Sequence, residues 1–151
     1  MSKKVNLNDF AKSLGDYSNL SIDQKKKAIT KGIVKSIPDL VAASPVDTGL
    51  YAQSWAFNVD EESIIIGNTA PYAGIIEDGA RPHRCPIGPL LAWAKRVLGS
   101  SSQPPDYDRE VWGLAIGVQK KIEEHGQAPK HVLANAIPKI IENIRMELSK
   151  A

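Results

Sequence analysis

Cysteine is almost missing from this chain, and so are long apolar runs. Cys85 is the single cysteine among 151 residues, so a disulfide within the chain is impossible. The sequence is therefore unlike the small disulfide-rich secreted domains and fits synthesis in a reducing cytosol. No apolar run approaches the ~20 residues needed to span a bilayer, and the first residues lack the apolar core of a secretory signal. We expect no membrane partner.

Positive charge is absent from a long central stretch. Residues 37–80 contain seven Asp or Glu and no Lys or Arg, for a net charge of −7. Residues 1–36 carry eight Lys against three Asp, and residues 81–151 carry eleven Lys or Arg against seven acids. Because nucleic-acid affinity comes from cations that displace counterions from phosphates, the central stretch is a poor nucleic-acid surface. The pattern favours contact between complementary protein surfaces, with ordinary solvated faces as the alternative.

A complete set of metal ligands is also lacking. His83 and Cys85 are two residues apart, but a structural zinc site needs four ligands, usually with a second close pair. His125 and His131 have no cysteine near them to complete such a set. We therefore expect no bound metal.

Patterns for catalysis and cofactor binding are missing as well. Cys85 lies between Arg84 and Pro86, without an acid to orient a Cys–His nucleophile pair. The acidic run 60–62 is interpreted as a solvated hairpin tip, which would not separate the carboxyl pKa values as acid–base catalysis requires. No glycine pattern opens a helix with a lysine, so no phosphate cradle is predicted. We expect no cofactor and no enzymatic activity; a hydrolase that depends on His83 or Cys85 stays an alternative.

The N-terminal third is predicted to contain one long helix. Ser21 and Gln24 form a capping box that opens it, and its Lys-rich face lies opposite its apolar positions. Pro38 should kink or restart this helix, because the proline ring clashes with the carbonyl four residues earlier. Residues 1–20 show weak periodicity. We expect a flexible N-terminal arm over 1–20 and a single α+β domain over 21–151.

Two strands are predicted after this helix, over 50–59 and 63–67. The second contains a β-branched isoleucine run that is typical of a buried strand. Residues 71–78 are predicted to form a short helix or turn. A helix should then begin at Pro86 and end with Gly99 as its C-cap.

Two more helices are predicted beyond the linker 100–105. Asp106 is expected to cap the first, in which Gly113 and Gly117 lie one turn apart and would let another backbone approach closely. The last helix is expected to follow Asn135, with Pro138 in its first turn. The predicted fold class is α+β, a small antiparallel β-sheet packed against several helices, with a long N-terminal helix and a helical C-terminal half.

The most specific feature is an ordered series of turn and strand residues between residues 45 and 84. Asp47 can hydrogen-bond the backbone two residues on, and Gly49 tolerates a positive φ. Pro71 and Pro82 restrict the residues before them to extended conformations. The residues that carry the series are Asp47, Thr48, Gly49, Ser54, Trp55, Tyr72, Glu77, Gly79 and Pro82.

In this order, the series resembles the head-to-tail joining or tail-completion proteins of tailed bacteriophages. The resemblance covers roughly residues 44–136, and the helix opening 86–90 and the closing segment 122–136 are also similar to relatives. One departure is visible. Relatives commonly carry basic residues just after the Asp-Thr-Gly turn, where this chain has Leu50 and Ala52.

The resemblance implies a structural virion protein in the neck of a tailed phage, which completes the tail or connects it to the capsid. It implies a homo-oligomeric ring, a hexamer or a dodecamer, that contacts other neck, adaptor or tail-tube proteins. DNA would pass through this ring without specific binding. The protein would assemble in the host cytoplasm and be located in the virion.

Charge and aromatic character indicate which residues would lie at subunit interfaces. Trp93 and Trp112 fall beside the apolar stripes of their helices, and exposed aromatic residues often mark interfaces, with a core position as the alternative. The other candidate elements are the predicted hairpin 60–62, the loop 78–84 and the N-terminal arm, and the first two contribute charged residues. The full set is Asp60, Glu61, Glu62, Asp78, Arg81, Arg84, Trp93 and Trp112.

A DNA-binding accessory protein is the alternative function. It would use the Lys-rich helix over 21–36 to contact phosphates, without aromatic side chains between the lysines to stack bases. The linker 100–105 exceeds the three- or four-residue turn of a helix-turn-helix, so that motif is not predicted.

Overall fold

The structure is a computed structural model that describes residues 2–99 and 108–151, with side chains from residue 5 onward. The chain forms two compact units: unit 1 contains Met1–Glu77 and Lys130–Ala151, and unit 2 contains Asp78–Pro129. The single domain over 21–151 stays a prediction. Within the described residues, the two helices of unit 2 pack mainly on each other. We describe each unit separately.

Unit 1 contains a three-stranded antiparallel sheet in the order β1-β3-β2. Its strands are β1 (Ser2–Val5), β2 (Trp55–Val59) and β3 (Ile64–Asn68). The β2–β3 hairpin is the one predicted from the isoleucine run, and the tip 60–62 lies between its strands. Strand β1 pairs with the other side of β3, where Val5 lies opposite Ile64.

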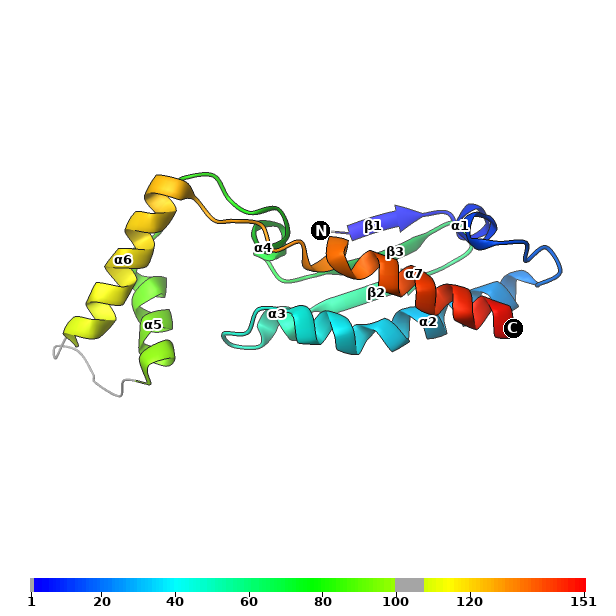
Figure 1. Ribbon diagram of the computed structural model, residues 1–151, viewed down its shortest axis with the longest axis horizontal. Helices are drawn as coiled ribbons and strands as arrows, with labels where there is room; N and C mark the ends of the chain where they lie inside the picture. The colour runs from blue at the N-terminus through cyan, green and yellow to red at the C-terminus, as the bar shows by residue number, and fades with distance from the viewer. Residues whose placement is uncertain (1, 100–107) are drawn as a thin grey trace. The chain divides into compact units, whose positions relative to one another are not determined.

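Two long helices of unit 1, α2 (Ile22–Ala43) and α7 (Val132–Lys150), lie side by side and antiparallel against the sheet (Figure 1). The backbones approach closely at Gly32, where an added Cβ would lie 2.5 Å from the Cα of Ile144. Nearby, the Asn143 amide donates to the Ser36 hydroxyl at 2.8 Å. The crossing therefore depends on a residue without a side chain.

The main core lies between this helix pair and the inner face of the sheet. Its largest fully buried side chains in unit 1 are branched aliphatic ones: Leu7, Ile29, Ile33, Leu40, Leu133, Ile144 and Leu148. Trp55 and Phe57 of β2 pack against the same cluster while staying partly exposed. The predicted α+β class is confirmed.

The capping box of the long helix is present as predicted. The Ser21 hydroxyl accepts from the Gln24 N–H at 3.2 Å, and the Gln24 side chain accepts from the Ser21 N–H at 2.9 Å. The helix continues through Pro38 as one element, so the predicted restart does not occur.

Residues 2–14, part of the predicted flexible arm, contain a strand and a helix. Beyond β1, helix α1 (Leu7–Leu14) begins at Asn6, whose side chain accepts from the N–H groups of residues 8 and 9. Leu7 is fully buried in the main core. The sequence hid this element because a helix of only two turns shows little periodicity.

The first predicted strand begins five residues later than expected. Residues Leu50–Gln53 form a short helix, α3, and β2 starts only at Trp55. Gly49 precedes α3 in the left-handed conformation, with φ of 84°. The prediction was wrong here because one turn of helix has no period long enough to detect. The short helix predicted near residue 73 is present as α4 (Ala73–Asp78).

The last helix begins earlier than predicted. Helix α7 starts at Val132, directly after His131, which has a φ of 50° and supplies no side-chain cap. Pro138 consequently lies inside α7 and not in its first turn. The start was missed because its cap comes from a residue distant in the sequence, as described below.

Unit 2 is a helical hairpin of α5 (Ile87–Leu98) and α6 (Arg109–His125). Gly99 ends α5 in the left-handed conformation, as predicted. Asp108 caps α6 through its side chain, whereas the predicted cap Asp106 and the linker 100–105 lie outside the described residues. The seam between the helices buries Ala94, Val111 and Ala115.

Candidate functional site

The Asp-Thr-Gly turn leads into a tightly bonded corner of unit 1. Asp47 and Thr48 are exposed, and Gly49 opens α3. At the end of α3, the Ser54 hydroxyl donates to the Leu50 carbonyl at 2.6 Å. The turn thus sets the direction in which the chain enters β2.

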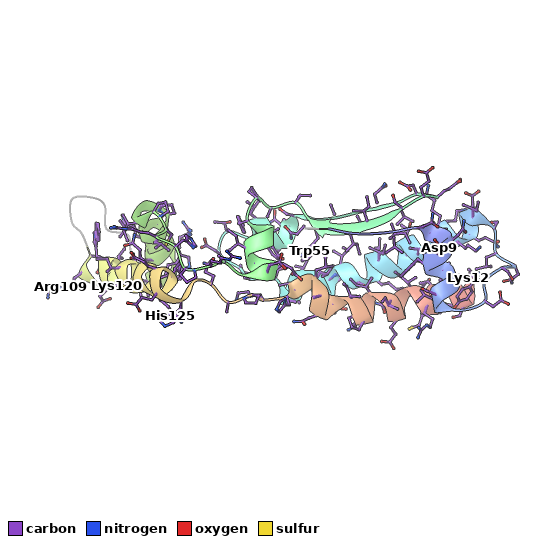
Figure 2. All side chains as sticks on the ribbon, turned by 90° about the horizontal axis from the view of Figure 1, so that it is seen from above. Asp9, Lys12, Trp55, Arg109, Lys120 and His125 are labelled. Carbon is purple, nitrogen blue, oxygen red and sulfur yellow. The ribbon has the colours of Figure 1, made fainter. Side chains whose placement is uncertain are left out.

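Trp55 ties β2 to the end of α2. Its indole N–H donates to the Ser44 hydroxyl at 2.9 Å, and that hydroxyl donates to the Leu40 carbonyl at 2.6 Å. The labelled Trp55 lies between the strands and the helices in Figure 2. This partly buried residue of the motif therefore links the sheet to the helix layer.

An aromatic cluster sits beside this link. The Tyr51 ring makes an edge contact with Trp55 at 5.6 Å between centroids and stacks on Tyr72 at 6.3 Å. Tyr51 is 3% exposed, and burial together with the negative charge of Glu77 raises the pKa of its phenol. Tyr72, a motif residue, covers this cluster from the solvent side.

The segment at the end of β3 is hydrogen-bonded to the α3–β2 connection. The Asn68 amide donates to the Tyr51 carbonyl at 2.8 Å, while its oxygen accepts from the Ala70 N–H at 3.0 Å. The Thr69 N–H and hydroxyl both donate to the Ser54 carbonyl. The separate motif pieces therefore meet in space and satisfy each other's polar groups.

Glu77 caps α7 from a distance of more than 50 residues in the sequence. Its two carboxylate oxygens accept from the N–H groups of Leu133 at 3.0 Å and Ala134 at 2.9 Å. The carboxylate is 2% exposed, and its charge lies at the positive end of the helix dipole. Glu77 therefore supplies the cap that His131 lacks. In the sequence, the absence of a capping side chain before Val132 is the signal that could have indicated a cap from a distant residue.

Gly79 and Pro82 belong to unit 2. Ala80 and Gln127 exchange two backbone hydrogen bonds, at 3.0 and 2.8 Å. Gly79 has a φ of 77°, and an added Cβ would lie 2.5 Å from the Gln127 carbonyl oxygen. This glycine is required for the close pairing of the two chain segments at the base of unit 2, while Pro82 is exposed.

The predicted interface residues differ in what they do. Asp60 holds the β2–β3 turn: its carboxylate accepts from the Ser63 N–H at 2.7 Å and from the Glu62 N–H at 3.0 Å. These hydrogen bonds, those from Ser63 first, lower the pKa of Asp60. Glu61 and Glu62 are exposed at the tip. The hairpin thus presents two carboxylates on a turn that a third one stabilises.

The other candidates lie in unit 2. Asp78, Arg81 and Arg84 are exposed, and Trp93 and Trp112 are half-buried. Trp93 packs against the small core between helices α5 and α6. The acidic turn belongs to unit 1 and these residues to unit 2, and their role at an interface stays a prediction.

The region of His83 and Cys85 is held by ordinary backbone contacts. The His83 imidazole Nδ1 lies 2.8 Å from the Arg81 carbonyl oxygen, and the Gln119 amide donates to the Cys85 carbonyl at 2.7 Å. Within residues 2–99 and 108–151, no group of three or more His, Cys, Asp or Glu has the arrangement of a metal site. The helices in the described part of the chain are too short or too polar to cross a membrane.

Together, the fold and the motif define a small α+β protein in which the distinctive residues join loops and cap a helix. Residues 8–79, just under half of the chain, match the family model described as "Bacteriophage HK97-gp10, putative tail-component". The match covers every motif residue except Pro82, so the resemblance to phage head–tail joining and tail-completion proteins is confirmed over this segment. No curated protein and no solved structure matches the chain.

Proposed function

We propose that this protein is a structural component of a tailed-phage virion that forms a homo-oligomeric ring at the head–tail interface. The ring completes the tail or connects it to the capsid, and its copy number is six or twelve. The observation that carries this proposal is the match of residues 8–79 to a phage tail-component family. The protein acts by association and carries out no chemical reaction.

The contacts inside unit 1 support this role. The motif residues are used to fix loops: Trp55 braces β2, Asn68 ties two loops together and Glu77 caps α7. A component that must fit identical neighbours needs loops of fixed shape, because each surface is repeated in every copy. The chemistry of the motif is therefore that of a scaffold.

The partners are further copies of the chain and other neck, adaptor or tail-tube proteins. Residues Glu61, Glu62, Arg81 and Arg84 are exposed and charged, and they would contribute to selecting partners by charge. The location is the virion, reached by assembly in the host cytoplasm. The comparisons lend no support to the DNA-binding alternative.

Deleting the gene from the phage that encodes the protein tests the proposal. We expect infected cells to accumulate filled heads and separate tails, which electron microscopy of lysates would reveal. A plasmid copy of the gene should restore joined particles. Normal yields of joined, infectious particles without the protein would contradict the proposal.

A further inference from the structure

The outer edge of β2 presents unused backbone groups. The Thr69 N–H donates to the Ser54 carbonyl, and the Asp60 N–H donates to the Ser63 carbonyl. Hydrogen-bonded positions alternate along an antiparallel strand, so the even-numbered residues of β2 bond to β3. Trp55, Phe57 and Val59 therefore direct their N–H and C=O groups to the edge, where the described residues place no further strand.

Strand β2 itself lacks the residues that normally block strand addition. The five residues Trp55–Val59 include no charge, no proline and no glycine. Natural proteins commonly protect edge strands with lysine, proline or bulges, because a bare edge pairs with other strands. The opposite edge strand, β1, contains Lys3 and Lys4. The two edges of the sheet are thus unequal.

The edge of β1 fits the edge of β2 in direction and phase. Both strands are antiparallel to β3, so they run parallel to each other. The even-numbered residues of β3 bond to β1. Lys3 and Val5 therefore direct their backbone N–H and C=O groups toward β3, whereas Ser2 and Lys4 direct theirs to the free edge. In a parallel pair, a residue bonds to the two residues that flank its level partner. Phe57 level with Lys3 of a second copy would therefore bond to its Ser2 and Lys4.

The charges of the two segments favour β1 of a second copy, and not β2 of a second copy, as the partner of the β2 edge. Strand β2 lies in the cation-free stretch 37–80, with net charge −7, and ends at the acidic tip 60–62. Two β2 edges together would pair two strands that both belong to this cation-free stretch, so neither would offer a cation to the other. Residues 1–36, which contain β1, carry a net charge of +5. Opposite charges across strands stabilise the pairing, and like charges oppose it.

We propose that the free edge of β2 binds the free edge of β1 in a second copy of this chain, so that their sheets join into one. The contact uses different patches on the two copies, and repeating it closes a ring when the rotation between copies permits. The inference rests on the proposed function, because it specifies how neighbouring subunits of that ring meet.

Disulfide cross-linking tests this contact directly. Lys4 and Asn58 are both paired with Ile65, on opposite sides of β3. In one chain they are therefore two strand spacings apart, about 10 Å, which exceeds the ~7 Å limit for a disulfide. In the proposed contact they are level neighbours on adjacent strands, within reach of a disulfide.

The experiment uses the full chain with Cys85→Ser to remove the native thiol. We expect the double variant Lys4→Cys, Asn58→Cys to form a ladder of disulfide-linked oligomers under mild oxidation at high concentration. An equimolar mixture of the two single variants should yield dimers, whereas each single variant alone should stay unlinked. A double variant Asn58→Cys, Lys150→Cys, with both residues exposed, measures random collision.

The outcomes separate the inference from the proposed function. Dimers of the Asn58→Cys variant alone would indicate β2–β2 pairing and would overturn the inference. A ring observed by light scattering or electron microscopy without cross-links in the double variant would also overturn it, while the proposed ring would stand. No oligomer and no cross-link at any concentration would overturn the inference, and the gene deletion would then decide the proposed function separately.

A charge exchange gives a second readout. Asn58→Lys would place a cation level with Lys4 of the neighbouring copy and should weaken self-association about fivefold. Adding Lys4→Glu should restore it, because the two charges then have opposite sign. Rescue by the second change is specific to this neighbour, and its absence would count against the pairing.

Discussion

The two units bury different kinds of side chain. Unit 1 packs leucine and isoleucine residues between two long helices and a sheet, whereas the seam of unit 2 buries Ala94, Val111 and Ala115. The family match ends at residue 79, so nearly all matched residues belong to unit 1. Unit 1 therefore contains the larger core and most of the motif, and α7 contributes to that core from outside the matched residues, while unit 2 relies on a narrow helix seam.

Glycines show the same difference. In unit 1, Gly32 lies against the backbone of Ile144, and the helix pair could not approach as closely with a side chain there. In unit 2, an added Cβ at Gly113 or Gly117 would meet nothing within 4 Å among the described residues. The close approach expected at these two glycines does not occur within the described chain.

The largest effect is expected from Gly32→Ala. The added methyl group would collide with backbone atoms of Ile144, which cannot rotate away, so unit 1 should lose about 3 kcal/mol of its free energy of unfolding. Urea unfolding followed by Trp55 fluorescence, with Trp93 and Trp112 replaced by Phe, reports on unit 1. An unchanged midpoint would show that the helix pair is looser than described.

Glu77→Ala should have the next largest effect. It removes the acceptors of the Leu133 and Ala134 N–H groups and should cost unit 1 about 2 kcal/mol. Glu77→Gln, which keeps one oxygen acceptor but no charge, should fall between wild type and Ala. The same urea titration checks both, and equal stability of Ala and wild type would refute the distant cap.

Gly113→Ala should act in the opposite direction. Alanine loses less backbone entropy than glycine in a helix, and no atom of the described residues lies within 4 Å of a Cβ added at Gly113, so unit 2 should gain about 1 kcal/mol. Urea unfolding followed by Trp112 fluorescence, with Trp55 and Trp93 replaced by Phe, measures this. If unit 2 is destabilised, another part of the protein lies against this face.

The smallest effect concerns Asp60. Hydrogen bonds from Ser63, then Glu62 and Asn58, hold the pKa of this carboxyl below its ordinary value of 3.8. A lowered pKa in the folded state adds stability above 3.8, and this stability is lost as the pH falls through the folded value. Asp60→Asn should therefore be less stable than wild type at neutral pH, and the difference should shrink in acid. A constant difference at all pH values would contradict this origin.

Sequence patterns predicted the elements whose signals are local. The capping box at Ser21, the isoleucine run of β3 and the C-cap at Gly99 each depend on adjacent residues, and each is present. The order of the motif residues predicted a resemblance to phage tail components, and residues 8–79 match such a family model. What the sequence did not reveal is how these residues contact one another.

The missed features depend on contacts between distant residues. Strand β1 forms because β3 offers it an edge, and α7 begins at Val132 because Glu77 caps it from far along the chain. Propensity within a short window contains no information on such partners. The one-turn helix α3 was missed for another reason, since four residues are too few to show a period.

The most direct test of a structural role is to count this chain in purified infectious particles of the phage that encodes it. Quantitative mass spectrometry against the major tail protein as an internal standard gives the number of copies per particle. A ring at the head–tail interface predicts a fixed number, six or twelve. Complete absence of the chain from infectious particles would contradict it.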